Sequence, residues 1–217
     1  MVSRRQGGSL RRLFVIAVIA LIAIFGIAKM PAQAADAIGQ LVKLRDAVVV
    51  TRAGADRPAT AGMALALHDT IKTGAKARAQ IAFADGSTVT LGQNSALVVD
   101  QYALDPSTGS RNVLLSVLSG AANAVVTKSG QGYFDYQIRT TDGYSAVRGT
   151  NWIVAVQDTT TRMVVISGLV EVGSKTGNRV VCEAGETVTI SAKSGLGTPS
   201  DAPPEIIRQF QDATVLP

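Results

Sequence analysis

Short apolar runs separated by polar turns dominate the chain beyond residue 38. The runs are rich in Val, Ile and Thr, and Gly, Asp, Asn and Ser lie between them, which is typical of β-strands and turns. In residues 77–83 one face reads Ala, Ala, Ile and Phe while the other carries Arg and Gln, as expected of a half-buried strand. The predicted strands are residues 47–52, 77–83, 88–91, 96–102, 113–118, 122–127, 133–140, 144–148, 151–157, 163–166, 169–173, 179–183 and 187–191.

This pattern predicts an all-β domain of stacked antiparallel sheets, either a β-sandwich or a short β-solenoid-like fold. Residues 47–71 and 169–190 also resemble one another weakly. Each reads as a hairpin, an Ala-Gly turn and a further strand, a plan that would suit stacked sheets. Two copies do not make a repeat, so shared architecture and chance both stay open.

The first 34 residues have the layout of an export signal. Four arginines precede an apolar run over residues 13–28, and Ala32-Gln33-Ala34 supplies the small residues that a signal peptidase recognises. We therefore expect a signal helix in residues 1–34, cleavage after Ala34, and a mature protein that is periplasmic or secreted. The alternative is an uncleaved anchor that holds the protein at the inner membrane, facing the periplasm.

Composition divides the remainder into a β-domain, residues 35–198, and a tail, residues 199–217. Three prolines between residues 199 and 204 indicate a linker. The residues that follow, 205–212, predict a short helix with one apolar side formed by Ile206, Ile207 and Phe210. We expect this helical tail either to lie on its own domain or to be frayed.

The charge distribution argues against nucleic acid as a partner. The formal net charge is +5, but residues 1–34 hold five basic residues and no acidic one, which leaves 16 basic and 16 acidic residues beyond them. Phosphate binding needs an excess of Lys and Arg, and the neutral remainder offers none. Membrane contact is expected only through the N-terminal segment, if that segment is not cleaved.

The residue types needed for most catalytic and metal sites are scarce. His68 and Cys182 are the only histidine and cysteine, so we predict no metal site. The phosphate-binding, dinucleotide-binding and serine-nucleophile motifs are absent from the sequence, so we predict no cofactor, no catalytic residue and no enzyme activity. His68 beside Asp69 is interpreted as a structural residue, and Cys182 as a small buried one.

Two segments stand out from the strand pattern. Asp85-Gly86 between two alternating runs predicts a hairpin turn, and Arg148-Gly149 interrupts an otherwise continuous strand, which predicts a β-bulge. Both have a purely structural interpretation. The functional alternative is that the bulge directs Arg148 and Trp152 toward a partner. The candidate partner-surface residues are Asp85, Gly86, Ser87, Arg148, Gly149, Thr150 and Trp152.

These segments belong to an ordered series of short motifs that resembles the FecR domain family, named for a regulator of iron-citrate transport. The series extends from about residue 39 to residue 191, and its order and spacing are specific although each piece is short. The motifs are DTIKTG at 69–74, AQIAFADGS at 79–87, NS at 94–95, LSG at 118–120, IRT at 138–140, VRGT at 147–150 with Trp152 and Val154, SGLVEV at 167–172 after Val165, and AGE at 184–186.

The resemblance implies a non-enzymatic envelope domain that relays a signal. The best-known members contact a TonB-dependent outer-membrane receptor and control an extracytoplasmic sigma factor. Only residues 1–12 precede the apolar run here, too few for a cytoplasmic sigma-binding domain, so we expect a stand-alone exported FecR-type domain. The leading hypothesis is a periplasmic sensory or protein-binding module with an envelope protein as partner. A carbohydrate-binding or cell-wall-binding structural module is the alternative.

Overall fold

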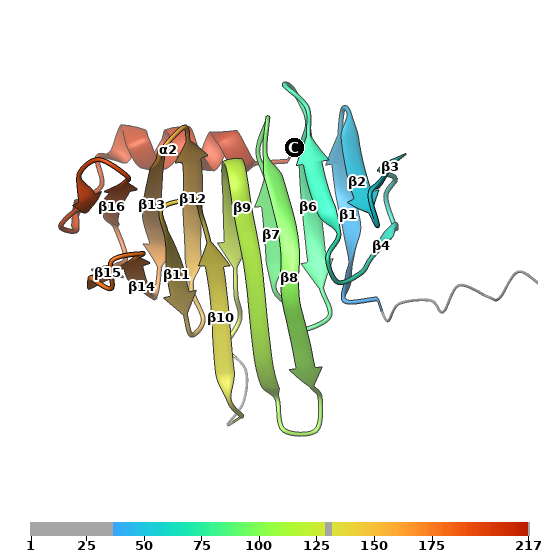
Figure 1. Ribbon diagram of the computed structural model, residues 1–217, viewed down its shortest axis with the longest axis horizontal. Coiled ribbons are helices and arrows are strands. Elements are labelled where there is room, and N and C mark those ends of the chain that lie inside the picture. Colours follow the sequence, from blue (N-terminus) through green and yellow to red (C-terminus); the bar gives the residue numbers. More distant parts are fainter. Residues whose placement is uncertain (1–36, 129–131, 217) are drawn as a thin grey trace, which may run out of the picture. The chain divides into compact units, whose positions relative to one another are not determined.

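The computed structural model describes residues 37–128 and 132–216, which form two stacked β-sheets and one helix (Figure 1). The all-β prediction with stacked antiparallel sheets and a helical tail is therefore confirmed. The predicted signal helix and its cleavage site lie outside the described residues. The predicted domain boundaries at residues 34 and 198 stay predictions.

One sheet, here called sheet A, has β4 at one end and the short strands β17 and β18 at the other. All of its pairings are antiparallel. Across the sheet its strands are β4 (Ala64–Leu65), β1 (Gly39–Arg45), β6 (Arg78–Phe83), β7 (Thr88–Leu91), the second half of β9 (Ser110–Val125), β12 (Asn151–Gln157), β13 (Thr160–Ser167), β16 (Glu186–Ser191), β17 (Gly195–Leu196) and β18 (Ser200–Asp201).

The second sheet, sheet B, has β3 and β15 as its two edge strands. Its pairings are antiparallel except between β9 and β10, which are parallel. Across the sheet its strands are β3 (Ala55–Pro58), β2 (Val48–Arg52), β5 (Thr70–Thr73), β8 (Ala96–Asp105), the first half of β9, β10 (Phe134–Arg139), β11 (Gly143–Val147), β14 (Leu169–Ser174) and β15 (Arg179–Glu183).

β9 joins the two sheets because it belongs to both. Its first part pairs with β8 as far as Ser119, and its second part pairs with β7 and β12 from Gly120 to Val125. The sequence pattern predicts two strands here, 113–118 and 122–127, because the alternation of buried residues is interrupted between them. The structure shows instead one strand that passes from sheet B to sheet A at Gly120, where φ is +75°.

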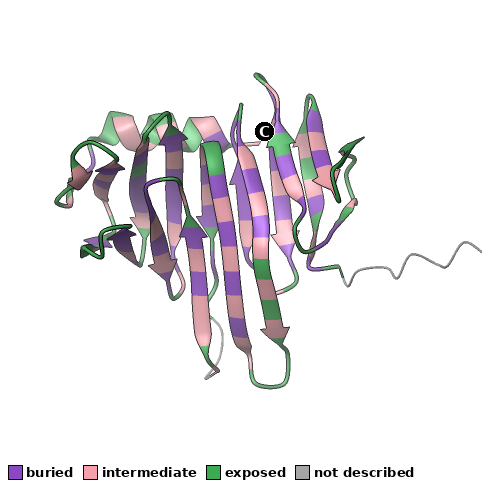
Figure 2. Ribbon diagram, in the orientation of Figure 1, coloured by how far each residue is buried: buried purple, intermediate pink, exposed green. Residues whose placement is uncertain are grey.

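The core lies between the sheets and is built from the inward-facing alternate residues of both. Figure 2 shows buried bands alternating with less buried ones along most strands. This alternation follows from the period of two in a strand. The largest fully buried side chains are Trp152, Tyr136, Leu41, Leu65, Ile71, Ile81, Leu91, Leu97, Leu115, Ile138, Ile153 and Met163.

The two segments that resemble one another in sequence occupy equivalent places at opposite ends of sheet B. β2 and β3 form the hairpin at one end, and β14 and β15 form the hairpin at the other. After each hairpin an Ala-Gly turn leads to a strand of sheet A. Gly62 and Gly185 have φ of +82° and +88° in these turns, and both donate their N–H to a carbonyl of sheet A. The plan predicted for both segments is present at both ends.

The tail forms helix α2 (Pro204–Thr214), which contacts β9 and β12 of sheet A. Proline at the first helical position suits a helix start, since its missing N–H would have no partner there. Thr214 is buried, and the Arg78 guanidinium donates to the Asp212 carbonyl at 3.2 Å. Of the two predicted alternatives, the structure therefore shows the docked helix. In the described part of the chain no helix has the length and hydropathy needed to cross a membrane.

Candidate functional site

The predicted turn at Asp85-Gly86 is present and connects β6 to β7. Gly86 has φ of +80°, which a glycine adopts without cost. The Asp85 carboxylate accepts the Ser87 N–H at 3.1 Å and the Ser87 hydroxyl at 2.6 Å. The turn is therefore closed by its own side chains.

The other Asp85 carboxylate oxygen forms a buried ion pair with Arg111 of β9. Their oxygen and nitrogen atoms are 2.7 Å apart, and the exposed fractions of the two side chains are 0% and 2%. The Arg111 guanidinium also lies 4.7 Å from the centre of the Phe134 ring, a cation–π contact. The ion pair thus fixes the β6–β7 turn of sheet A against sheet B.

Two tyrosines complete this cluster from the sheet B side. The Tyr102 hydroxyl accepts the Asp85 backbone N–H at 2.7 Å, and the Tyr136 hydroxyl lies 3.4 Å from the Ser87 hydroxyl. Burial, followed in size for Tyr102 by the Asp85 charge, raises the pKa of both phenols well above the usual value. Both therefore stay protonated and neutral, which makes them structural hydrogen-bonding groups.

The two candidate segments meet in the core through Tyr136. Its ring packs edge-on against the Trp152 ring, with centroids 6.3 Å apart, and the Trp152 indole N–H donates to the Ser145 hydroxyl at 3.2 Å. The partner-surface assignment of Trp152 is therefore wrong, because the residue is 0% exposed. Ser87 and Thr150 are buried as well and are likewise unavailable to a partner.

The prediction of a β-bulge at Arg148-Gly149 is also wrong. The strands on either side belong to different sheets, since β11 pairs within sheet B and β12 within sheet A. The two residues form the connection between them. Buried residues recur along both β11 and β12. Because the connection between the two strands is short, the sequence resembles a single strand with one interruption.

Gly149 is held in a conformation that a side chain would strain. Its φ is +105°, and an added Cβ would overlap the Lys128 side chain and lie 3.1 Å from the Lys128 backbone nitrogen. We expect Gly149→Val to lower stability by about 1–3 kcal/mol through backbone strain alone, measured as a fall in melting temperature. An unchanged melt would contradict the strain at this connection.

In contrast to Trp152, Arg148 has an exposed side chain. It borders a groove of about 520 Å³ on the outer face of sheet B. Ala146 is part of the lining, and it lies between Gln137 of β10 and Glu171 of β14 in the cross-strand register. The lining also includes Tyr133, Asp135, Leu169 and Val181.

The groove concentrates exposed apolar side chains. Tyr133 is 66% exposed, and Leu169 and Val181 are each 56% exposed. Charged groups of both signs, Arg148, Asp135 and Glu171, line the groove with them. We expect Arg148→Ala to leave the melting temperature within experimental scatter, because exposed substitutions of this kind change stability by about 0.5 kcal/mol or less. A large fall would show that Arg148 is paired within the domain.

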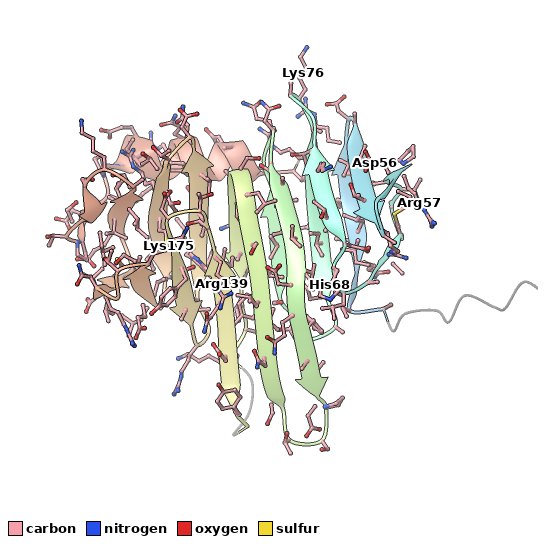
Figure 3. The ribbon with its side chains drawn as sticks, viewed as in Figure 1. Asp56, Arg57, His68, Lys76, Arg139 and Lys175 are labelled. Carbon is pink, nitrogen blue, oxygen red and sulfur yellow. The ribbon has the colours of Figure 1, made fainter. Side chains whose placement is uncertain are left out.

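His68 and Cys182 lie apart and do not form a reactive pair. His68 is exposed in the connection before β5, toward the β3 end of sheet B (Figure 3), whereas Cys182 is buried in β15 at the other end. The buried Asp69 carboxylate is bonded to Arg52, at 2.7 and 2.6 Å, and to the Ala66 N–H. Burial, and then the charge of Glu186, raises the pKa of Cys182 to about 11. In the described residues no group of three His, Cys, Asp or Glu side chains could hold a metal ion.

Comparison with known proteins gives a family match over this same region. A family model described as FecR protein matches residues 69–171. Residues 69–171 therefore match a FecR domain. The matched range begins at Asp69 and ends in β14 at Glu171, so it contains the Asp85–Arg111 ion pair, the Arg148-Gly149 connection and all but one edge of the groove.

Two solved structures have a similar fold. Two crystal structures of a candidate anti-sigma factor from Parabacteroides distasonis each have a TM-score of 0.52 and 18% sequence identity, over 64% of this chain. The chain spans 62% of the length of those solved chains. At this identity the likeness concerns the fold. The comparison with curated proteins gives no match.

Arg111 is the residue that sequence reasoning missed in the FecR domain. It occupies an inward position in the alternation with Val113, Leu115 and Val117, and all four are buried. The signal was a charged residue in phase with an apolar face, since such a residue needs a buried counter-charge. Predicting the strand to begin at residue 113 placed Arg111 outside it.

Proposed function

We propose that this FecR-domain protein is a non-enzymatic sensory module of the bacterial envelope that binds a protein partner through the groove on sheet B. The observation that carries the proposal is the grouping of Tyr133, Leu169 and Val181, all more than half exposed, around Arg148. Aromatic residues and arginine contribute most to protein–protein binding energy, and exposed apolar groups gathered together mark interaction sites. The export signal predicted in residues 1–34 supports a periplasmic location.

The buried Asp85–Arg111 cluster has a supporting part in this proposal. It fixes Phe134 at the start of β10, directly after Tyr133, and Phe134 itself lines the groove. A groove built on strands and supported from below keeps its shape when a partner arrives. The cluster therefore acts on binding through the position of β10.

A photo-crosslinking amino acid at position 133 tests the groove in the cell. We expect a discrete adduct with an envelope protein, identified by mass spectrometry, when the probe replaces Tyr133. The control probe replaces Leu118, which is 52% exposed on β9 but does not line the groove. The same adducts at both positions, or none at position 133, would contradict the groove as the binding site.

Leu169→Lys tests the groove by substitution, and Leu118→Lys is its control outside the groove. A lysine in place of an exposed leucine leaves the fold intact but places a charge in the apolar part of the groove, so we expect at least about a tenfold loss of adduct, which corresponds to 1.4 kcal/mol. Leu118→Lys should leave the adduct unchanged. Sedimentation with purified peptidoglycan addresses the cell-wall alternative, since retention that survives Leu169→Lys would favour a carbohydrate-binding module.

A further inference from the structure

The two edges of sheet B differ in how they are protected. At one edge, β3 has the sequence Ala-Asp-Arg-Pro, and all four residues are exposed. Figure 3 shows Asp56 and Arg57 at this end of the molecule. Pro58 carries no N–H, and proline and charge on an edge strand discourage pairing with another chain. Sheet A ends at both sides in strands of two residues, which offer little to pair with.

The other edge of sheet B, β15, has no proline, and its two charged residues lie only at its ends. Among the described residues β15 pairs with β14 alone, and it lies at the end of the molecule opposite β3 (Figure 1). Its sequence is Arg-Val-Val-Cys-Glu, with an apolar centre and no proline. Val181, in the middle, is 56% exposed.

The hydrogen bonds around β15 show which of its backbone groups face outward. The Glu183 N–H donates to the Glu186 carboxylate at 2.7 Å, and the Ser174 N–H donates to the Asn178 carbonyl at 2.9 Å. Backbone groups of alternate residues point to the same side of an antiparallel strand. The even-numbered residues of β15 therefore face β14, and the backbone N–H and C=O of Arg179 and Val181 face the open edge.

The sequence of β15 is complementary to itself in the antiparallel direction. If two copies are centred on Val181, that residue lies opposite its own counterpart, and Arg179 lies opposite Glu183 of the other copy. Opposite charges directly across a strand pair stabilise it, whereas like charges destabilise it. The Arg179 and Glu183 side chains are both exposed on the outer face with Val181, so they would meet there. The same register lets Glu183 keep its bond to Glu186, because its carbonyl is free to accept from Arg179.

We propose that β15 pairs edge to edge with β15 of a second copy of this chain, in the antiparallel register centred on Val181, which makes a two-fold symmetric dimer with a continuous sheet B. This interface shares Val181 with the proposed partner groove, and it places the grooves of the two copies on one shared surface. Arg179 is 3.5 Å from Glu171 of its own chain, an exposed pair of little strength that can be exchanged for the intermolecular one.

Cysteine cross-linking in the full-length chain tests both the interface and its register. In a hydrogen-bonded antiparallel pair opposite Cα atoms are about 5.5 Å apart, within disulfide range. We expect Val181→Cys to give a disulfide-linked dimer after mild oxidation in the cell envelope, seen on a non-reducing gel. The wild-type chain should give none, because its single cysteine, Cys182, is buried.

Two controls report on chance collisions. In the proposed register the two copies of position 179 are about 13 Å apart, too far for a disulfide, so Arg179→Cys should not cross-link. Leu118→Cys, exposed elsewhere on the domain, should not cross-link either. The double variant Arg179→Cys with Glu183→Cys should cross-link again. Equal cross-linking at positions 181, 179 and 118, or none at 181, would overturn the proposal.

Charge reversal gives a second measurement in the Val181→Cys background. Arg179→Glu and Glu183→Arg should each reduce the dimer band at least about fivefold, since each places like charges opposite one another. The two together should restore it. A disulfide from position 181 to a different protein, in place of the dimer, would show that another chain occupies this edge and would overturn pairing with a second copy. This result is separate from the position 133 adduct, so each proposal can fail alone.

Discussion

Arg111→Met is expected to destabilise the domain by about 3–5 kcal/mol, because it leaves the Asp85 carboxylate buried without its counter-charge. The Asp85 side chain is 0% exposed, and the Ser87 N–H and hydroxyl that donate to it carry no charge that could replace the guanidinium. Methionine fills much of the space of the arginine stem, so loss of volume contributes little. For a domain of this size the melting temperature should fall by roughly 6–20 °C.

The matched control is the double variant that adds Asp85→Asn to Arg111→Met. Asparagine keeps the shape and can still accept from Ser87, but it carries no charge that needs a partner. We expect the double variant to be more stable than Arg111→Met alone, with a coupling energy of about 1–3 kcal/mol between the two positions. Additive losses would show that the two side chains do not act as a pair. Weaker cross-linking at position 133 in Arg111→Met would confirm that the pair positions β10.

The strands were predictable because each has a clear local pattern. Residues 151–157 and 179–183 were predicted with the bounds that the structure shows, since alternation and flanking turn residues agree there. β1 and β5 were missed. In β1 the register shifts between Leu41 and Lys43, which breaks the alternation. β1 has Lys43 and Arg45 among its outward residues, and β5 has only four residues. Short strands with charged outer faces gain their stability from neighbouring strands, which a local pattern does not contain.

The candidate site was harder to predict because exposure depends on which sheet a residue faces. Arg148 and Trp152 are four residues apart, yet one lies exposed beside the groove and the other is fully buried, because the chain crosses between sheets at Gly149. The groove itself combines residues from β10, β11, β14 and β15. Strand order across sheet B brings these together, and strand order is a property of the whole fold.

Gly120→Val is expected to have an effect of comparable size, more than about 3 kcal/mol, because two separate costs add at this position. The first is backbone strain, since φ is +75° and an L-residue in that region costs about 1–2 kcal/mol. The second is overlap. An added Cβ would collide with the Ser95 hydroxyl and lie 2.5 Å from the Ser95 Cα and 2.8 Å from the Asn94 carbonyl oxygen.

The overlap at Gly120 involves backbone that has little freedom to move. The Ser95 hydroxyl is bonded to the Ala121 backbone on the other side of the crossing, at 3.1 Å to its carbonyl and 3.0 Å to its N–H. Displacing Ser95 would therefore break the contacts that guide β9 from sheet B into sheet A. Chemical denaturation of Gly120→Ala and Gly120→Val measures the combined loss of stability. Gly120→Ala should already show most of this loss.

Gly177→Val separates the two costs, because Gly177 has φ of +91° but nothing lies within 4 Å of an added Cβ. This variant should lose only the stability that corresponds to backbone strain, about 1–2 kcal/mol. The difference between Gly120→Val and Gly177→Val then gives the contribution of the close approach at the crossing. Equal losses would mean that conformational freedom alone, and not the space between β9 and Ser95, requires glycine where the two sheets join.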